Sequence, residues 1–173
     1  MSRRRLVTYI LLFLFLSAAV YNLLPENSLP ENTVFDRIEV EKSKRLLHGY
    51  YQGKLVKTYK ISFGSVPVGH KQFEGDGRTP EGIYFIDDKN PYSVYHLNLG
   101  VSYPNFMDYY NADKYNTSPG GDIKIHGLKN GFCFLGKFHR LFDWTYGCIA
   151  VTCGEIEEIY RAMPLGKVIE IKK

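Results

Sequence analysis

The stretch Gly121–Cys153, GDIKIHGLKNGFCFLGKFHRLFDWTYGCIAVTC, decides what the rest of this 173-residue chain must build. It opens with the short apolar run 123–125, which delivers His126, and it closes with a glycine turn that carries Cys148. A histidine and a cysteine far apart in sequence, each presented at a strand end, are the usual components of a thiol nucleophile and its base. The remaining elements are expected to support this pair.

The chemistry of such a pair sets further requirements on its neighbours. A cysteine attacks as its thiolate, and the pKa of a free thiol is too high for much thiolate at neutral pH, so an imidazole must take the proton. The imidazole needs an acceptor on its other nitrogen, and the backbone carbonyl of Gly127 would suffice. Gly147 allows a sharp turn and leaves the amides around Cys148 free to form an oxyanion hole.

Length and composition indicate one folded domain with a short extension. The high aromatic content, 14 Tyr and 11 Phe, favours β structure. The formal net charge is +4, and Arg3, Arg4 and Arg5 supply three of those charges, so the folded part is close to neutral. The sequence has no concentrated basic face, which argues against nucleic-acid binding.

The N-terminus carries an export signal. Three arginines precede the apolar run 6–24, which is long enough to cross a bilayer as an uncleaved anchor with its N-terminus inside. The alternative is a cleaved signal peptide, with 17–19 (Ser-Ala-Ala) as the cleavage site. Residues 1–24 are therefore predicted to be the anchor or signal peptide and 25–35 a linker, and residues 36–173 the domain outside the cytoplasm.

Periodicity predicts mainly β structure with short helices, an α+β class. Alternating apolar residues in 36–64 predict three strands joined by hairpins, and further strands are expected at 83–86, 95–101 and 167–171. Residues 104–115 predict a short helix with Pro104 in its first turn. Thr152 and Glu155 form a capping box that starts a second helix, which Pro164 ends.

Three cysteines leave other interpretations open. Cys133 and Cys153 could pair as a disulfide, which would leave Cys148 free, although a packed thiol is the favoured prediction for Cys153. Cys153 is also a second candidate nucleophile, and His139 a second candidate base. A zinc site formed by these cysteines and histidines lacks the usual Cys-x2-Cys spacing, so no metal is predicted. The remaining alternative is that His126 and Cys148 are ordinary buried residues with no catalytic role.

Three motifs, in order, resemble the L,D-transpeptidase (YkuD-type) catalytic domain family. They are the loop 69–82 (GHKQFEGDGRTPEG), Ile125-His126-Gly127, and the segment 143–152 (DWTYGCIAVT), with the segment 101–105 (VSYPN) between the first two. The loop 69–82 and the segments 101–105 and 143–152 are most similar to the YafK/ErfK-like branch. The resemblance implies a mixed β-sandwich or barrel with a cradle around the cysteine. It also implies Cys148 as nucleophile, His126 as base, and Gly127, Tyr146 and Gly147 as supporting groups.

The sequence departs from the family pattern at several positions. Tyr146 replaces a histidine common before the Gly-Cys pair, and Ala150 stands where an Arg or Asn often grips a substrate carboxylate. The segment 129–144 is longer than in the shortest members and is predicted to form a lid or cleft wall. The candidates for lining the substrate cleft are His139, Asp143, Trp144, Thr145 and His70.

The family resemblance predicts acyl transfer on peptidoglycan stem peptides through a thioester on Cys148, in cell-wall biogenesis or remodelling. An L,D-specific hydrolase that releases a wall-linked peptide or protein is the alternative, and a non-catalytic wall-binding module is the second. The chemistry requires no cofactor. The expected location is the periplasm, either anchored in the inner membrane or secreted.

Overall fold

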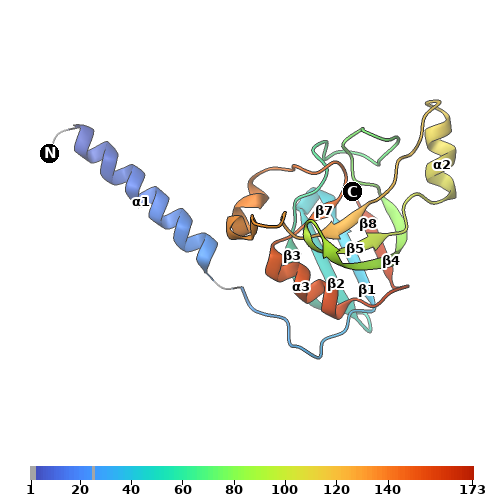
Figure 1. Ribbon diagram of the computed structural model, residues 1–173, viewed down its shortest axis with the longest axis horizontal. Coiled ribbons are helices and arrows are strands. Elements are labelled where there is room, and N and C mark those ends of the chain that lie inside the picture. The colour runs from blue at the N-terminus through green and yellow to red at the C-terminus, as the bar shows by residue number, and fades with distance from the viewer. Residues whose placement is uncertain (1–2, 25) are drawn as a thin grey trace.

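The computed structural model describes residues 3–24 and 26–173, so Met1, Ser2 and Pro25, which belong to the predicted leader and linker, lie outside the described residues. Helix α1 (Arg3–Leu23) projects away from a compact domain (Figure 1). Its mean hydropathy is 2.1, and it is long and apolar enough to cross a membrane. A helix of this kind near the N-terminus is compatible with either an anchor or a signal peptide.

The domain is built on one mixed eight-stranded sheet of order β3-β2-β1-β8-β4-β5-β6-β7 (Figure 1). The predicted hairpins and the α+β class are confirmed. The strands are β1 (Arg37–Glu41), β2 (Leu46–Tyr51), β3 (Lys54–Lys60), β4 (Gly82–Ser93), β5 (His96–Val101), β6 (Lys124–His126), β7 (Ile149–Ala150) and β8 (Val168–Lys172). Strand β4 extends well beyond the predicted 83–86, because two register shifts let it bend while it stays paired with β5.

Strand β1 lies at the centre of one half of the sheet, antiparallel to β2 and parallel to β8. Its Ile38 and Val40 are fully buried, as are Ile169 of β8 and Leu47 of β2. These side chains meet buried aromatic and aliphatic residues from β3, β4 and α3 in one contiguous core. The core is therefore assembled from both ends of the chain, which brings the C-terminal strand beside the first strand of the domain.

The sheet curls into a half-barrel because the chain after β3 returns to β7. Ser62 and Ala150 exchange two backbone hydrogen bonds, of 3.0 and 2.7 Å, in an antiparallel bridge. A parallel bridge joins Gly64 to Thr145 close by. Both contacts flank Cys148, so closure of the half-barrel fixes the backbone on either side of the predicted nucleophile.

Two α-helices flank the sheet, each with a capping box. Helix α2 (Phe106–Asp113) starts two residues after Pro104, and Asn105 caps it, so the prediction that Pro104 sits in its first turn is wrong. An asparagine side chain satisfies the free amides at a helix start, and proline cannot do so. Helix α3 (Cys153–Ala162) begins with the predicted box of Thr152 and Glu155. Its buried face, which includes Ile156 and Ile159, packs into the core.

A 3₁₀ segment, η2 (Cys133–Leu141), lies between β6 and β7 and contacts the end of α1. Cys133 is joined to Cys153 by a disulfide across 20 residues, with a Cα–Cα distance of 5.7 Å. Cys153 is therefore not the packed free thiol that the sequence favoured, because its Cα lies within bridging distance of Cys133. Cys148 is the free cysteine.

The disulfide should stabilise the fold through the loop that it closes. Replacing both Cys133 and Cys153 with serine is expected to lower the free energy of unfolding by about 3 kcal/mol, the value for a loop of this length. The measurement is denaturant unfolding of the full chain in detergent, with Cys148→Ser as the matched control. Thiol titration of the unfolded, unreduced wild type should find one thiol; three thiols would contradict the bridge.

Candidate active site

The site is created by two adjacent parallel strands, β6 and β7. Their register pairs His126, the last residue of β6, with Ala150, and Cys148 stands immediately before β7. Both His126 and Cys148 line one cavity of about 430 Å³. The structure therefore brings together the two residues that the sequence selected as nucleophile and base.

The orientation of His126 is fixed by its backbone neighbour. The ring is only 5 % exposed, and its Nδ1 lies 2.7 Å from the carbonyl oxygen of Gly127. Because a carbonyl only accepts hydrogen bonds, Nδ1 carries the proton and Nε2 is left as the basic nitrogen. Tyr95 and Trp144 pack against the ring, with centroids 4.7 and 5.8 Å away.

Gly127 is needed for this close geometry. A Cβ on residue 127 would lie 2.9 Å from Cγ2 of Ile156 and 3.1 Å from the carbonyl oxygen of Tyr95. The amide of Gly127 donates to that same carbonyl at 3.2 Å, so it is already used. Gly127 therefore supports His126 through its carbonyl and its small size, and its amide does not face the cavity as a free donor.

The turn before Cys148 is closed by the side chain of Thr145. Its Oγ1 donates to the carbonyl oxygen of Cys148 at 2.7 Å and accepts from the amide of Gly147 at 3.2 Å. Gly147 has a φ of +134°, and a Cβ there would lie 2.7 Å from the carbonyl oxygen of Arg78. Only glycine satisfies both conditions, so the loop 69–82, which holds Arg78, shapes the turn directly.

The predicted oxyanion donors differ in availability. The amide of Gly147 is bound to Thr145. In residues 3–24 and 26–173, no acceptor is found for the amides of Tyr146 and Cys148. Two unpaired amides beside a nucleophile suit a developing oxyanion better than an amide that is already bonded.

Burial favours the neutral forms of both Cys148 and His126. Burial raises the pKa of the Cys148 thiol, and the carboxylate of Asp122 adds to this, while the backbone amide and ammonium of Lys124 oppose it. Burial also lowers the pKa of His126, against the effect of the Gly127 carbonyl. The thiol of Cys148 donates to the carbonyl oxygen of Asp122 at 3.5 Å, and it shares the cavity with His126. With a neutral thiol and a neutral imidazole, no thiolate–imidazolium pair is formed in advance, so a base would act during attack.

The five predicted cleft residues divide into two groups. Trp144, Thr145 and Tyr146 line the cavity with Cys148, although only the first two were predicted for that role. Among the described residues lining it, His139, Asp143 and His70 are absent. His139 is buried in a second, apolar cavity of about 310 Å³ that shares Tyr95 and Trp144 with the first.

The three residues outside the cavity have structural contacts of their own. Burial lowers the pKa of His139 to about 4, and its Nδ1 lies 3.4 Å from Oγ of Ser62. Asp143 forms an ion pair with Arg45 at 2.6 Å. His70 accepts a hydrogen bond from the amide of Glu81, and its other nitrogen lies 3.1 Å from a carboxylate oxygen of Asp108.

Asn98 and Lys124 are among the polar residues of the cavity that were not selected from the sequence. Asn98 of β5 is paired with His126 in the sheet, is 4 % exposed, and its Oδ1 has no hydrogen-bond partner within the described chain. Lys124 is the one lysine or arginine among the described residues that line the cavity. The period-2 rule of strands places Lys124 on the face of His126 and was a usable signal, whereas Asn98 depends on pairing between distant segments.

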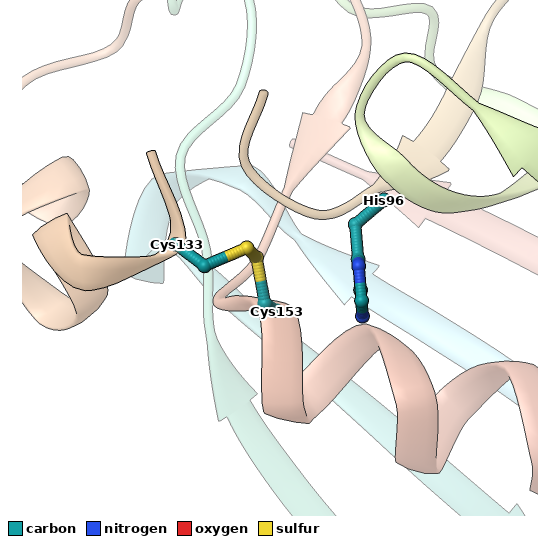
Figure 2. A group of neighbouring side chains, drawn as sticks. All are labelled: His96, Cys133 and Cys153. Atoms are coloured by element: carbon teal, nitrogen blue, oxygen red, sulfur yellow. A yellow bond between two sulfur atoms is a disulfide. The ribbon is translucent and has the colours of Figure 1, made fainter. Parts of the chain in front are cut away.

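A metal site is the remaining interpretation of the cysteines. His96, Cys133 and Cys153 offer ligand atoms within 4.8 Å of one another (Figure 2). The two sulfur atoms are bonded to each other, and Nε2 of His96 lies 2.6 Å from Oε1 of Glu157. Thiolates are the usual cysteine ligands of zinc, so this cluster in its oxidised form does not fit a zinc site.

Comparison with known proteins identifies the family. A family model described as the L,D-transpeptidase catalytic domain (YkuD) matches residues 36–171. The chain therefore belongs to the YkuD L,D-transpeptidase catalytic domain family. This membership supports a peptidoglycan-related transpeptidase activity.

Individual relatives agree with this assignment. The chain is 31 % identical over 130 residues to YafK of Escherichia coli K-12, a protein assigned as an L,D-transpeptidase. The aligned region covers 72 % of this chain and 45 % of YafK. The helical cell shape determining protein Pgp2 of Campylobacter jejuni has a TM-score of 0.59 and 26 % identity, covering 79 % of this chain and 48 % of Pgp2. An L,D-transpeptidase of Xylanimonas cellulosilytica shares the fold, with a TM-score of 0.52, 14 % identity, and coverage of 84 % and 64 %. The chain thus spans about half the length of YafK and Pgp2.

The neutral state of the pair can be tested by alkylation with iodoacetamide. Because the pKa of Cys148 is raised, labelling should be slow at neutral pH and should rise as the solution becomes alkaline, without a plateau near neutrality. His126→Ala should leave labelling at neutral pH nearly unchanged. The same variant should lower turnover about 10²–10⁴-fold through loss of the base. A neutral-pH plateau that His126→Ala abolishes would show a preformed ion pair instead.

Proposed function

We propose that this protein is a cysteine-dependent acyltransferase acting on peptidoglycan stem peptides outside the cytoplasm, in cell-wall biogenesis or remodelling. The observation that carries the proposal is the presence of Cys148 and His126 on one cavity, with Nδ1 of His126 held by the carbonyl oxygen of Gly127. The family, together with the description of Pgp2 as a helical cell shape determining protein, points to the cell wall as the place of action.

In the first step, Sγ of Cys148 attacks the stem-peptide carbonyl on the L-centre side of diaminopimelate. Nε2 of His126 takes the thiol proton as the S–C bond forms, and the amides of Tyr146 and Cys148 stabilise the oxyanion. The C–N bond then breaks, and the imidazolium returns the proton to the leaving amine. The product is a thioester on Cys148.

In the second step, an acceptor resolves the thioester. An amine from a second stem peptide loses its proton to His126 and forms a new amide bond, which releases the thiol of Cys148. The energy of the first peptide bond is conserved in the thioester, so the exchange requires no nucleotide. Water at the same position would give hydrolysis. Tyr146, 88 % exposed, leaves this part of the turn open to solvent, which keeps a hydrolase as the second candidate.

The carboxylate of the substrate needs a cation in the cavity. Ala150, where other members often carry Arg or Asn, is fully buried and paired with Ser62, so it does not face the cavity. Lys124 supplies a cation instead. Its ammonium forms an ion pair with Asp122 at 2.6 Å, but the Asp122 side chain is mostly exposed, so solvent screens this pair and weakens it. We assign Lys124 the role of binding a free carboxylate of the stem peptide.

The acyl transfer is tested by incubating the full chain in detergent with tetrapeptide muropeptides, followed by mass spectrometry. Wild type should give a thioester adduct on Cys148 and a new crosslink, and Cys148→Ala should give neither. In ¹⁸O-labelled water, label in the released peptide would identify hydrolysis. If the wild type binds muropeptides without turnover, and Cys148→Ala binds them equally well, the protein is a wall-binding module and neither the transpeptidase nor the hydrolase proposal holds.

The role of Lys124 is tested with Lys124→Met and paired substrates. For a stem peptide with a free carboxylate, KM should rise about tenfold, the loss of one charge-assisted hydrogen bond. For the matching carboxamide peptide, KM should be the same in wild type and variant. An equal rise of KM for both substrates would contradict a specific carboxylate contact.

A further inference from the structure

An apolar surface on the domain is not used by the proposed reaction. It consists of large side chains in and beside η2 that are 38–76 % exposed: Phe132, Phe134, Leu135, Leu141 and Phe142. These five residues come from an eleven-residue segment, and we name them the η2 apolar surface. The rings of Phe132 and Phe134 stack with their centroids 6.1 Å apart, and Phe132, Leu135 and Phe142 line one apolar cavity. A contiguous exposed group of this kind usually marks a contact with a protein or a membrane.

The end of α1 is seated directly against this segment. Asn22 donates to the carbonyl oxygen of Phe134 at 3.3 Å and accepts from the amide of Lys137 at 2.7 Å. The ammonium of Lys137 donates to the carbonyl oxygen of Leu24 at 2.7 Å and lies 5.2 Å from the ring centre of Tyr21. Figure 1 shows η2, in orange, beside the last turn of α1.

The glycine inside η2 allows this close approach. A Cβ at Gly136 would lie 2.6 Å from Oδ1 of Asn22, and its φ is +45°. Carbonyls at a helix C-terminus lack partners within the helix. Lys137 therefore satisfies the last turn of α1, and η2 is fixed to the point where α1 ends.

The length of α1 places that point at a bilayer surface. With 21 residues, α1 spans about 30 Å at 1.5 Å per residue, which equals the hydrocarbon thickness of a bilayer. With Arg3 to Arg5 on the cytoplasmic side, Leu23 reaches the outer boundary of the hydrocarbon layer. Whatever contacts Asn22 and Leu24 must then lie among the lipid head groups.

The charges near the η2 apolar surface match such a location. Lys129, just before Phe132, is exposed, and its ammonium has no carboxylate partner in the part of the chain that the structure describes. Lysines near a membrane surface are attracted to anionic lipids, and aromatic side chains are favoured at the head-group level.

We propose that the η2 apolar surface inserts into the outer face of the lipid bilayer that α1 crosses. The bilayer is favoured over a second copy of the chain because α1, which contacts η2, is long and apolar enough to cross a membrane, and the proposal rests on α1 being retained as an anchor. Trp144 and Tyr95 form the wall shared by the apolar cavity beside η2 and the catalytic cavity. The catalytic cavity would then be held close to the membrane surface, within reach of stem peptides near that surface.

The proposal is tested by tryptophan fluorescence in nanodiscs that hold one full-length chain. The discs contain phosphatidylcholine and phosphatidylglycerol, with or without bromine on the acyl chains. Trp144 is the only tryptophan, so every probe is placed in a Trp144→Phe background. Leu141→Trp and Phe134→Trp report on the η2 apolar surface. Phe106→Trp, an exposed position at the start of α2 at the opposite end of the molecule (Figure 1), is the matched control.

Brominated lipid should remove most of the emission of Leu141→Trp and Phe134→Trp, and it should leave Phe106→Trp unchanged. The proposal would be overturned if the emission of all three probes were the same with brominated lipid as without it. A second copy would be the occupant if brominated lipid does not quench the η2 probes with one chain per disc and their emission changes only when two chains share a disc. That result would also overturn the proposal. Circular dichroism of each variant controls for folding.

Discussion

The candidate site depends on Ser62, because this residue contacts both η2, which precedes Cys148, and β7, which follows it. Its backbone exchanges two hydrogen bonds with Ala150, which closes the half-barrel onto β7. Its hydroxyl donates to the carbonyl oxygen of His139 at 3.0 Å, which ties η2 to the same point. Ser62 is 1 % exposed, so these bonds are shielded from water and are costly to break. Cys148 and the segment that leads into Trp144 of its cavity are thereby positioned by one residue that carries no chemistry.

Sequence reasoning succeeded where the signal is local. The capping box of Thr152 and Glu155 needs only four consecutive residues, and the structure contains it. The presentation of His126 follows from three residues that form β6. Asn98 and Ser62 gave no such signal, because each acquires its place through contacts between segments far apart in sequence. The extent of β4 was missed for a related reason, since its bends depend on the register of β5.

A partly buried charge cluster links the linker, η2 and α3: the side chains of Arg140 and Glu155 are largely buried, and Glu26 is exposed. Arg140 of η2 contacts Glu26 at 3.0 Å and Glu155 at 2.7 Å, and Glu155 also accepts from the amide of Thr152. Burial raises the pKa of Glu155, although Arg140 opposes the shift. Such pairs add little net stability but strongly penalise the loss of one partner. The role of the cluster is therefore to position η2 against the start of α3, where the disulfide also joins the two segments.

The disulfide and the neutral thiol address the same chemical problem. A disulfide is typical of oxidising surroundings, where a free thiol is at risk because the thiolate is the form that oxidises. Cys133 and Cys153 form the disulfide and have no free thiol. Burial raises the pKa of the Cys148 thiol, which favours its protonated form until a base removes the proton. A preformed ion pair would react faster with substrate and also with every oxidant. Under the proposed mechanism, His126 activates Cys148 only as a substrate carbonyl is attacked, at the expense of the resting reactivity of the thiol.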